Sequence, residues 1–175
     1  MASAAIRNLR MLARYNTWAN ARLFDALAAV PAQALSQRRA TGQGSLLGTL
    51  SHAWVVDQIW QAHLEGRPHG YASRNTASEP ALAQLQAGQA ALDAWYTAYA
   101  DDLQPQAHDE VVDFRFVDGG GGAMRRGDIL LHVINHKTYH RGYVAQMLYE
   151  SGHRPPVMDL PVFLRDVPQV QDVGS

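Results

Sequence analysis

Residues 128–150 read DILLHVINHKTYHRGYVAQMLYE, and this stretch sets the expected fold because its apolar positions recur every three or four residues. Side chains with that period lie on one face of a helix. The stripe consists of Ile129, Val133, His136, His140, Val144 and Met147. Two histidines therefore lie on the helix face that is expected to pack against the rest of the chain.

His136 and His140 are four residues apart, so their rings stand about one turn apart on the same face. A buried imidazole without a partner costs on the order of 1–3 kcal/mol, and a metal ion shared by both rings would remove that cost. His132 extends the series by one turn. The alternative is that these are ordinary core or interface histidines bonded to backbone or carboxylate groups.

Three more stretches show a helical period. The first covers about residues 4–30, and the second covers about 45–65 with Ser45 as its N-cap. The third has Pro80 in its first turn and a bundle-type apolar seam that reaches Leu103.

The connections complete the predicted fold. Residues 31–44 are too irregular to form an element of their own, and residues 66–78 form a polar loop. Residues 112–116 alternate apolar and charged side chains, and four glycines after Asp118 indicate a turn, so a small β-hairpin is expected. The sequence predicts an all-α four-helix bundle with long crossover connections, formed by residues 1–175 as one domain.

Composition excludes several classes of partner and of metal site. The chain has a net charge of −1 and no long basic run, so nucleic acid is not an expected partner. It has no cysteine, which leaves His, Asp and Glu as metal ligands. No apolar run is long enough to span a bilayer and the N-terminal stretch lacks a signal-type core, so no membrane association and a cytoplasmic location are expected.

The histidines favour a metal site inside the bundle. Bundles hold metals between facing helices, and His52 on the second helix lies on an apolar face, as do His136 and His140 on the last. Three neutral imidazoles leave at least one position on a divalent ion for water, which is the composition of a catalytic site. The sequence marks no general acid or base.

Other polar residues are candidates for lining a cavity beside the metal. Asn16 interrupts the apolar stripe of the first helix, Asn20 follows one turn later, and Tyr143 lies near the paired histidines. The alternative for Asn16 is a structural hydrogen bond between helices. Arg141 is expected at the surface or an interface, and Gly142 at a close approach between helices.

Four motifs resemble the DinB/YfiT-like superfamily of metal-dependent proteins. They are YNTWAN (15–20), GTLSHAWVVDQIW (48–60), HVINHKTYHRG (132–142) and GHRPPVMDL (152–160). The resemblance covers nearly the whole chain and implies a four-helix bundle, usually a homodimer. It also implies His52, His136 and His140 as ligands of nickel or zinc, and places His132 at a position that is not a ligand.

The resemblance also implies a small-molecule substrate, because similar proteins include transferases and isomerases that use glutathione, mycothiol or bacillithiol. The leading hypothesis is therefore a metal-dependent enzyme that uses a low-molecular-weight thiol as cosubstrate. A metal-dependent hydrolase with Asp57 as a candidate proton acceptor is the second hypothesis. A non-enzymatic, stress-associated dimer with a structural metal is the third.

Overall fold

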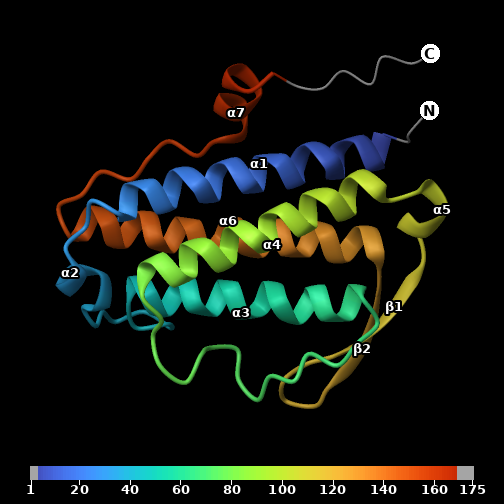
Figure 1. The fold of residues 1–175 in the computed structure, drawn as a ribbon, viewed down its shortest axis with the longest axis horizontal. Helices are drawn as coiled ribbons and strands as arrows, with labels where there is room; N and C mark the ends of the chain where they lie inside the picture. The colour runs from blue at the N-terminus through green and yellow to red at the C-terminus, as the bar shows by residue number, and fades with distance from the viewer. Residues whose placement is uncertain (1–3, 169–175) are drawn as a thin grey trace.

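Four long helices pack side by side as a bundle, with a short β-hairpin beside one end (Figure 1). The computed structural model describes residues 4–168. In chain order the elements are α1 (Ala4–Leu27), α2 (Ala32–Ser36), α3 (Leu46–Leu64), α4 (Leu82–Asp102), α5 (Pro105–His108), β1 (Val111–Arg115), β2 (Gly121–Arg125), α6 (Arg126–Glu150) and α7 (Leu160–Asp166). The predicted all-α four-helix bundle with a hairpin before the last long helix is confirmed.

Each long helix packs mainly against two of the others. α1 packs against α4 and α6, and α3 packs against the same two helices. α1 and α3 therefore occupy diagonally opposite corners of the bundle. This arrangement brings α3 and α6, which carry the predicted metal ligands, into direct contact along their lengths.

The connection over residues 65–81 runs back along the bundle, so that α3 and α4 point in the same direction (Figure 1). The connection from α1 to α3 stays at one end and contains the short helix α2. The prediction that residues 31–44 form no element is therefore wrong. Leu35 is buried there, and its apolar contacts stabilise a helical turn that local sequence signals do not indicate.

Helix ends follow some of the predicted signals. The Ser45 hydroxyl accepts a hydrogen bond from the backbone N–H of Gly48 at 2.8 Å, which satisfies one free amide of the first turn of α3. α4 begins at Leu82, so Pro80 precedes its first turn. Gly152 ends α6 with a positive φ of 77°, a conformation that glycine adopts without steric cost.

The core is divided along the bundle axis. One apolar layer surrounds Trp60 and Tyr96, and a second surrounds Leu46 and Met147. Both layers receive side chains from all four long helices. Between them the helices contribute polar side chains instead, and the candidate site lies at this level.

The β-hairpin closes one side of the bundle near the end of α3. β1 and β2 are antiparallel, with Val111 opposite Arg125 and Arg115 opposite Gly121. The Phe114 ring packs edge-on against Trp60 of α3 at a centroid distance of 5.0 Å. This contact holds the hairpin against the bundle and thereby positions Arg115.

The segment after α6 packs back onto α1. Its short helix α7 buries Phe163, whose ring lies 5.8 Å from that of Tyr15. This contact holds the segment against the bundle, and residues 169–175 lie outside the described part of the chain. Across residues 4–168, none of the helices combines the length and apolar character needed to cross a membrane.

Candidate metal centre

The structure brings the three predicted ligands together. His52 comes from α3, and His136 and His140 come from successive turns of α6. One ring nitrogen from each residue lies within 4.8 Å of those of the other two. The Nε2 atoms of His136 and His140 are 3.1 Å apart. Among residues 4–168, no further His, Asp or Glu joins this group.

All three imidazoles are held in the neutral form. The pKa of His136 is lowered to about 2 and that of His140 to about 4, mainly by burial and to a lesser extent by neighbouring imidazoles and the Lys137 ammonium. Burial also lowers the pKa of His52. A neutral imidazole has the free lone pair that metal coordination requires.

A backbone contact sets the orientation of His52. Its Nδ1 atom lies 3.0 Å from the carbonyl oxygen of Arg74, in the crossover connection between α3 and α4. A carbonyl oxygen can only accept a hydrogen bond, so Nδ1 carries the proton and Nε2 has the lone pair. Metal-binding histidines commonly have this arrangement, with one nitrogen facing the ion and the other donating to the protein.

The other two rings lack comparable partners. The Nδ1 atoms of His136 and His140 are buried and make no hydrogen bond within the described residues. Among residues 4–168, their Nε2 atoms have only each other as hydrogen-bond partners. A cation shared by these atoms would compensate for burying two imidazoles, and an all-nitrogen donor set suits a transition ion such as zinc or nickel. The residues present therefore fit a divalent metal.

A cavity of about 180 Å³ lies beside His52 and His136. Its apolar wall is formed by Val56, Ile59, Trp60, Phe116 and Val117, and its polar wall by His63, Arg74, Arg115 and His132. His132 lies one turn before His136, and their ring centroids are 5.7 Å apart. His132 does not belong to the three-histidine group, so the structure places it beside the candidate site and on the cavity wall.

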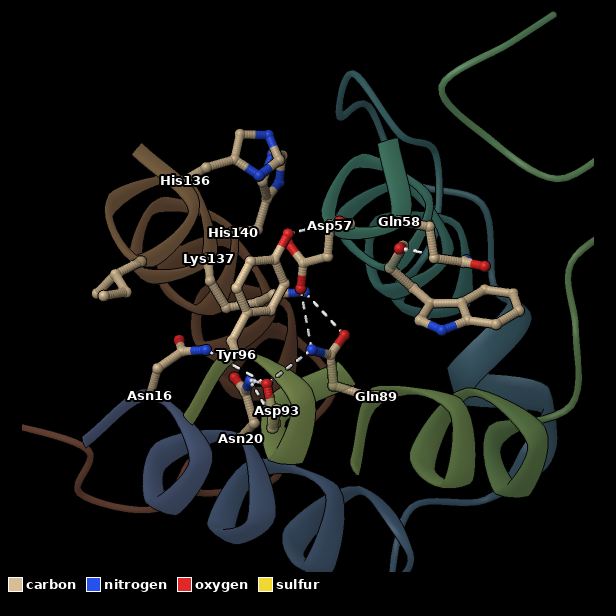
Figure 2. A network of polar contacts seen from close by, with 12 residues as sticks. Asn16, Asn20, Asp57, Gln58, Gln89, Asp93, Tyr96, His136, Lys137 and His140 are labelled. Carbon is tan, nitrogen blue, oxygen red and sulfur yellow. Dashed lines mark hydrogen bonds and ion pairs between the residues drawn. The ribbon is translucent and has the colours of Figure 1, made fainter. Parts of the chain in front are cut away.

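A network of buried polar contacts lies next to the histidines and links α3, α4 and α6 (Figure 2). The Lys137 ammonium is 2.8 Å from the Asp57 carboxylate and donates a hydrogen bond to the Gln89 carbonyl at 2.8 Å. The Gln89 amide in turn donates to Asp57 at 3.0 Å and to Asp93 at 2.9 Å.

The second half of the network joins α1 to α4 and α6. The amide groups of Asn16 and Asn20 donate to Asp93, and their carbonyl oxygens accept from the Arg141 guanidinium at 2.6 and 2.9 Å. Burial raises the pKa of Asp93 to about 6, although Lys137 and its hydrogen-bond donors favour the ionised form. Two acids and two bases are thus buried together at the level of the histidines.

The other sequence-predicted residues lie away from the 180 Å³ cavity. Asn16 and Asn20 lie in the buried network, where their side chains are saturated by Asp93 and Arg141. Tyr143 is 41% exposed, with its ring 6.2 Å from that of His140 and its hydroxyl bonded to that of Tyr139.

Two expectations about α6 were wrong. Arg141 is 4% exposed and bonds to α1, because the buried face of α6 is wider than the stripe of every third or fourth residue that contains the histidines. Gly142 is exposed, and a Cβ atom added to it would have nothing within 4 Å, so no helix between residues 4 and 168 approaches it closely.

Sequence reasoning also missed Lys137, Gln89 and Asp93. A signal was present: Lys137 and Arg141 are one turn apart, and Val133 and Val144 continue the same row in both directions. Charged residues in an apolar row indicate buried charges that need partners.

Comparisons with known proteins agree on one family. The model of the DinB family matches residues 4–170. The chain is 26% identical over 166 residues to Protein DinB of Bacillus subtilis (strain 168), with 87% of this chain and 91% of that protein covered. It is similar to the crystal structure of a DinB-like protein from Bacillus cereus ATCC 10987, with a TM-score of 0.64, 19% identity and coverage of 82% and 91%. The structural similarity supports the fold.

Proposed function

This chain belongs to the DinB family, and from that membership and its three-histidine group we propose that it is a metal-dependent enzyme using a low-molecular-weight thiol. The reaction is a transfer of the thiol to an electrophile, or an isomerisation that the thiol assists. The physiological ion is zinc or nickel.

One observation carries the proposal: three neutral imidazoles converge beside a cavity, and no fourth protein ligand joins them within the described chain. Three protein ligands and an open position are the pattern of catalytic rather than structural sites. A divalent ion bound there would act as a Lewis acid and lower the pKa of a thiol that binds to it.

The residues of the chain position the reactants. The apolar wall around Ile59, Trp60 and Phe116 excludes water from one side of the cavity and suits an apolar electrophile. In the transfer reaction the thiol releases its proton to solvent, its sulfur forms a bond to an electrophilic carbon, and the leaving group departs with its electron pair. In the isomerisation the sulfur adds to one carbon of a double bond, which becomes a single bond about which the adduct rotates. The double bond then re-forms as the thiolate leaves.

The two alternative functions have less support. The hydrolase hypothesis needs a carboxylate near the ion as proton acceptor, but the Asp57 carboxylate is completely buried and paired with Lys137, and the residues described around the cavity include no acid. A structural metal favours a closed set of four ligands, and three are present in residues 4–168.

The test is a thiol-transfer assay on untagged protein loaded with zinc or nickel. Glutathione and 2-mercaptoethanol are each supplied with 1-chloro-2,4-dinitrobenzene, and thioether formation is measured against the uncatalysed rate. The proposal expects an excess rate that a chelator removes and added metal restores, and that His140→Ala lacks. Equal rates for wild type, chelated protein and His140→Ala with every thiol would contradict it.

We also propose that the chain forms a homodimer. The outer surface of α6 exposes Tyr139 and Tyr143, which are 59% and 41% accessible, beside the unobstructed Gly142. Aromatic side chains next to a small residue favour close packing between subunits. Light scattering at micromolar concentration would show a dimer mass, and a monomer mass would contradict this proposal.

A further inference from the structure

Two arginines are held at the cavity wall by histidines of α3. The carbonyl oxygen of Arg74 accepts from His52 at 3.0 Å, and that of Arg115 lies 3.1 Å from His63 Nε2 and accepts from it. These contacts fix the crossover connection and strand β1 against the same helix. Both arginines line the 180 Å³ cavity that also contains His52 and His136.

The cavity has an excess of positive charge. Within the part of the chain that the structure describes, its lining contains Arg74 and Arg115 and no carboxylate, and burial favours the neutral form of its four histidines, so the charge comes from the two arginines. Neither guanidinium forms an ion pair with a residue between 4 and 168, whereas Arg67 nearby pairs with Glu65. A divalent ion on the histidines would add to this charge. The whole chain has a net charge of −1, so the positive cavity is a local feature.

A larger hollow adjoins the cavity. A hollow of about 880 Å³ shares His63 and Arg115 with it and is further lined by Arg67, His69, the glycines of β2 and one carboxylate, that of Asp113. A molecule with its reactive end at the histidines therefore has room to extend past Arg115. Guanidinium groups in such a position recognise carboxylates through paired, charge-assisted hydrogen bonds.

We propose that the substrate bound at this site carries carboxylate groups, and that Arg74 and Arg115 bind them while the thiol end reaches the three histidines. The inference rests on the proposed function for the identity of the reactive end. It assigns the two arginines as specificity-determining residues, and it predicts that neutral thiols bind more weakly than anionic thiols of similar size.

The experiment is calorimetric titration of the zinc-loaded protein with three probes: mercaptosuccinate, 2-mercaptoethanol and succinate. The variants are Arg74→Gln, Arg115→Gln and the double variant, with Arg154→Gln as a matched control because Arg154 is exposed and lines neither cavity. The Arg74 and Arg115 carbonyls remain in every variant, so the backbone contacts of His52 and His63 are kept. Zinc content and circular dichroism verify this, and Arg74→Lys with Arg115→Lys retains the charge if a glutamine variant does not fold.

We expect the double glutamine variant to bind mercaptosuccinate and succinate about tenfold more weakly than wild type, and the lysine variant to recover part of this loss. The dissociation constant of 2-mercaptoethanol stays within about twofold of the wild-type value in all variants. The dissociation constants of all three probes stay within the same range in Arg154→Gln. Unchanged mercaptosuccinate and succinate affinities in the double variant would overturn the inference. If neither thiol gains affinity from zinc but succinate binding still depends on the arginines, the thiol function fails and the carboxylate site stands.

Discussion

The Nζ atom of Lys137 lies 2.8 Å from Oδ2 of Asp57, and both side chains are buried between the two helices that carry the histidines. Lys137 is adjacent in sequence to His136 on α6, and Asp57 follows His52 by five residues on α3. The ion pair therefore fixes the position of α3 against α6. It sets the distance between His52 and the other two histidines without contacting the cavity.

Removing the Lys137 ammonium leaves a buried, uncompensated carboxylate. We expect Lys137→Met to lower the free energy of unfolding by about 3–5 kcal/mol, as is usual when one partner of a buried ion pair is lost. The double variant Asp57→Asn with Lys137→Met removes both charges and should be more stable than Lys137→Met alone. Urea unfolding monitored by circular dichroism measures both differences, and a Lys137→Met protein as stable as wild type would refute this role.

Two glycines on different helices form a matched pair for testing the packing. A Cβ atom on Gly88 of α4 would lie 2.7 Å from the Trp54 ring nitrogen, whereas one on Gly142 of α6 would meet nothing within 4 Å. At a protein concentration low enough to keep the chain monomeric, Gly142→Ala should stabilise it by roughly 0.5–1 kcal/mol, because alanine favours the helix. Gly88→Ala should destabilise it, since Trp54 must move. The packing account fails if thermal unfolding shows both variants shifted equally in the same direction.

The buried histidines predict that the metal-free protein loses stability in mild acid. Because the pKa values of His136 and His140 fall from 6.5 to about 2 and about 4, the unfolded chain takes up protons first as the pH falls below about 6.5. Each histidine then removes up to about 1.4 kcal/mol of stability per pH unit. The raised pKa of Asp93, about 6, acts in the opposite direction: its contribution is complete below about 3.8 and is lost as the pH rises through 6.

Between pH 7 and pH 5 the stability lost through the two histidines exceeds the stability gained through the Asp93 carboxyl group. The urea midpoint of the metal-free protein should therefore fall between pH 7 and pH 5, and fall less in the variant with His136→Ala and His140→Ala. A midpoint that is flat or rises over this range in wild type would show that the rings are not held neutral by burial.

The helices and the ligand group could be predicted because both depend on local spacing. A step of four residues places His136 and His140 on one helix face, and the apolar periods of the other three stretches define a bundle. His52 was indicated by its place on the apolar face of the second helix, and the family resemblance implied the same ligand, although spacing alone does not determine which helices become neighbours. Ser45 and Gly152 marked helix ends through backbone chemistry that is also local.

The buried network and the cavity could not be predicted in the same way. Asp57 and Gln89 become partners of Lys137 only when α3, α4 and α6 meet, at sequence separations of more than 30 residues. Arg74 and Arg115 lie in a connection and a hairpin whose positions depend on backbone contacts with α3. Such long-range contacts leave no periodic signal in the sequence.

The central claim, that His52, His136 and His140 hold one divalent ion, is tested most directly by elemental analysis of untagged protein loaded with zinc or nickel and freed of excess metal. The account predicts about one ion per chain for wild type and for His132→Ala, and almost none for His140→Ala, with the helical circular dichroism spectrum kept in all three. Absence of bound metal in loaded wild-type protein, or equal metal loss in His132→Ala and His140→Ala, would contradict it.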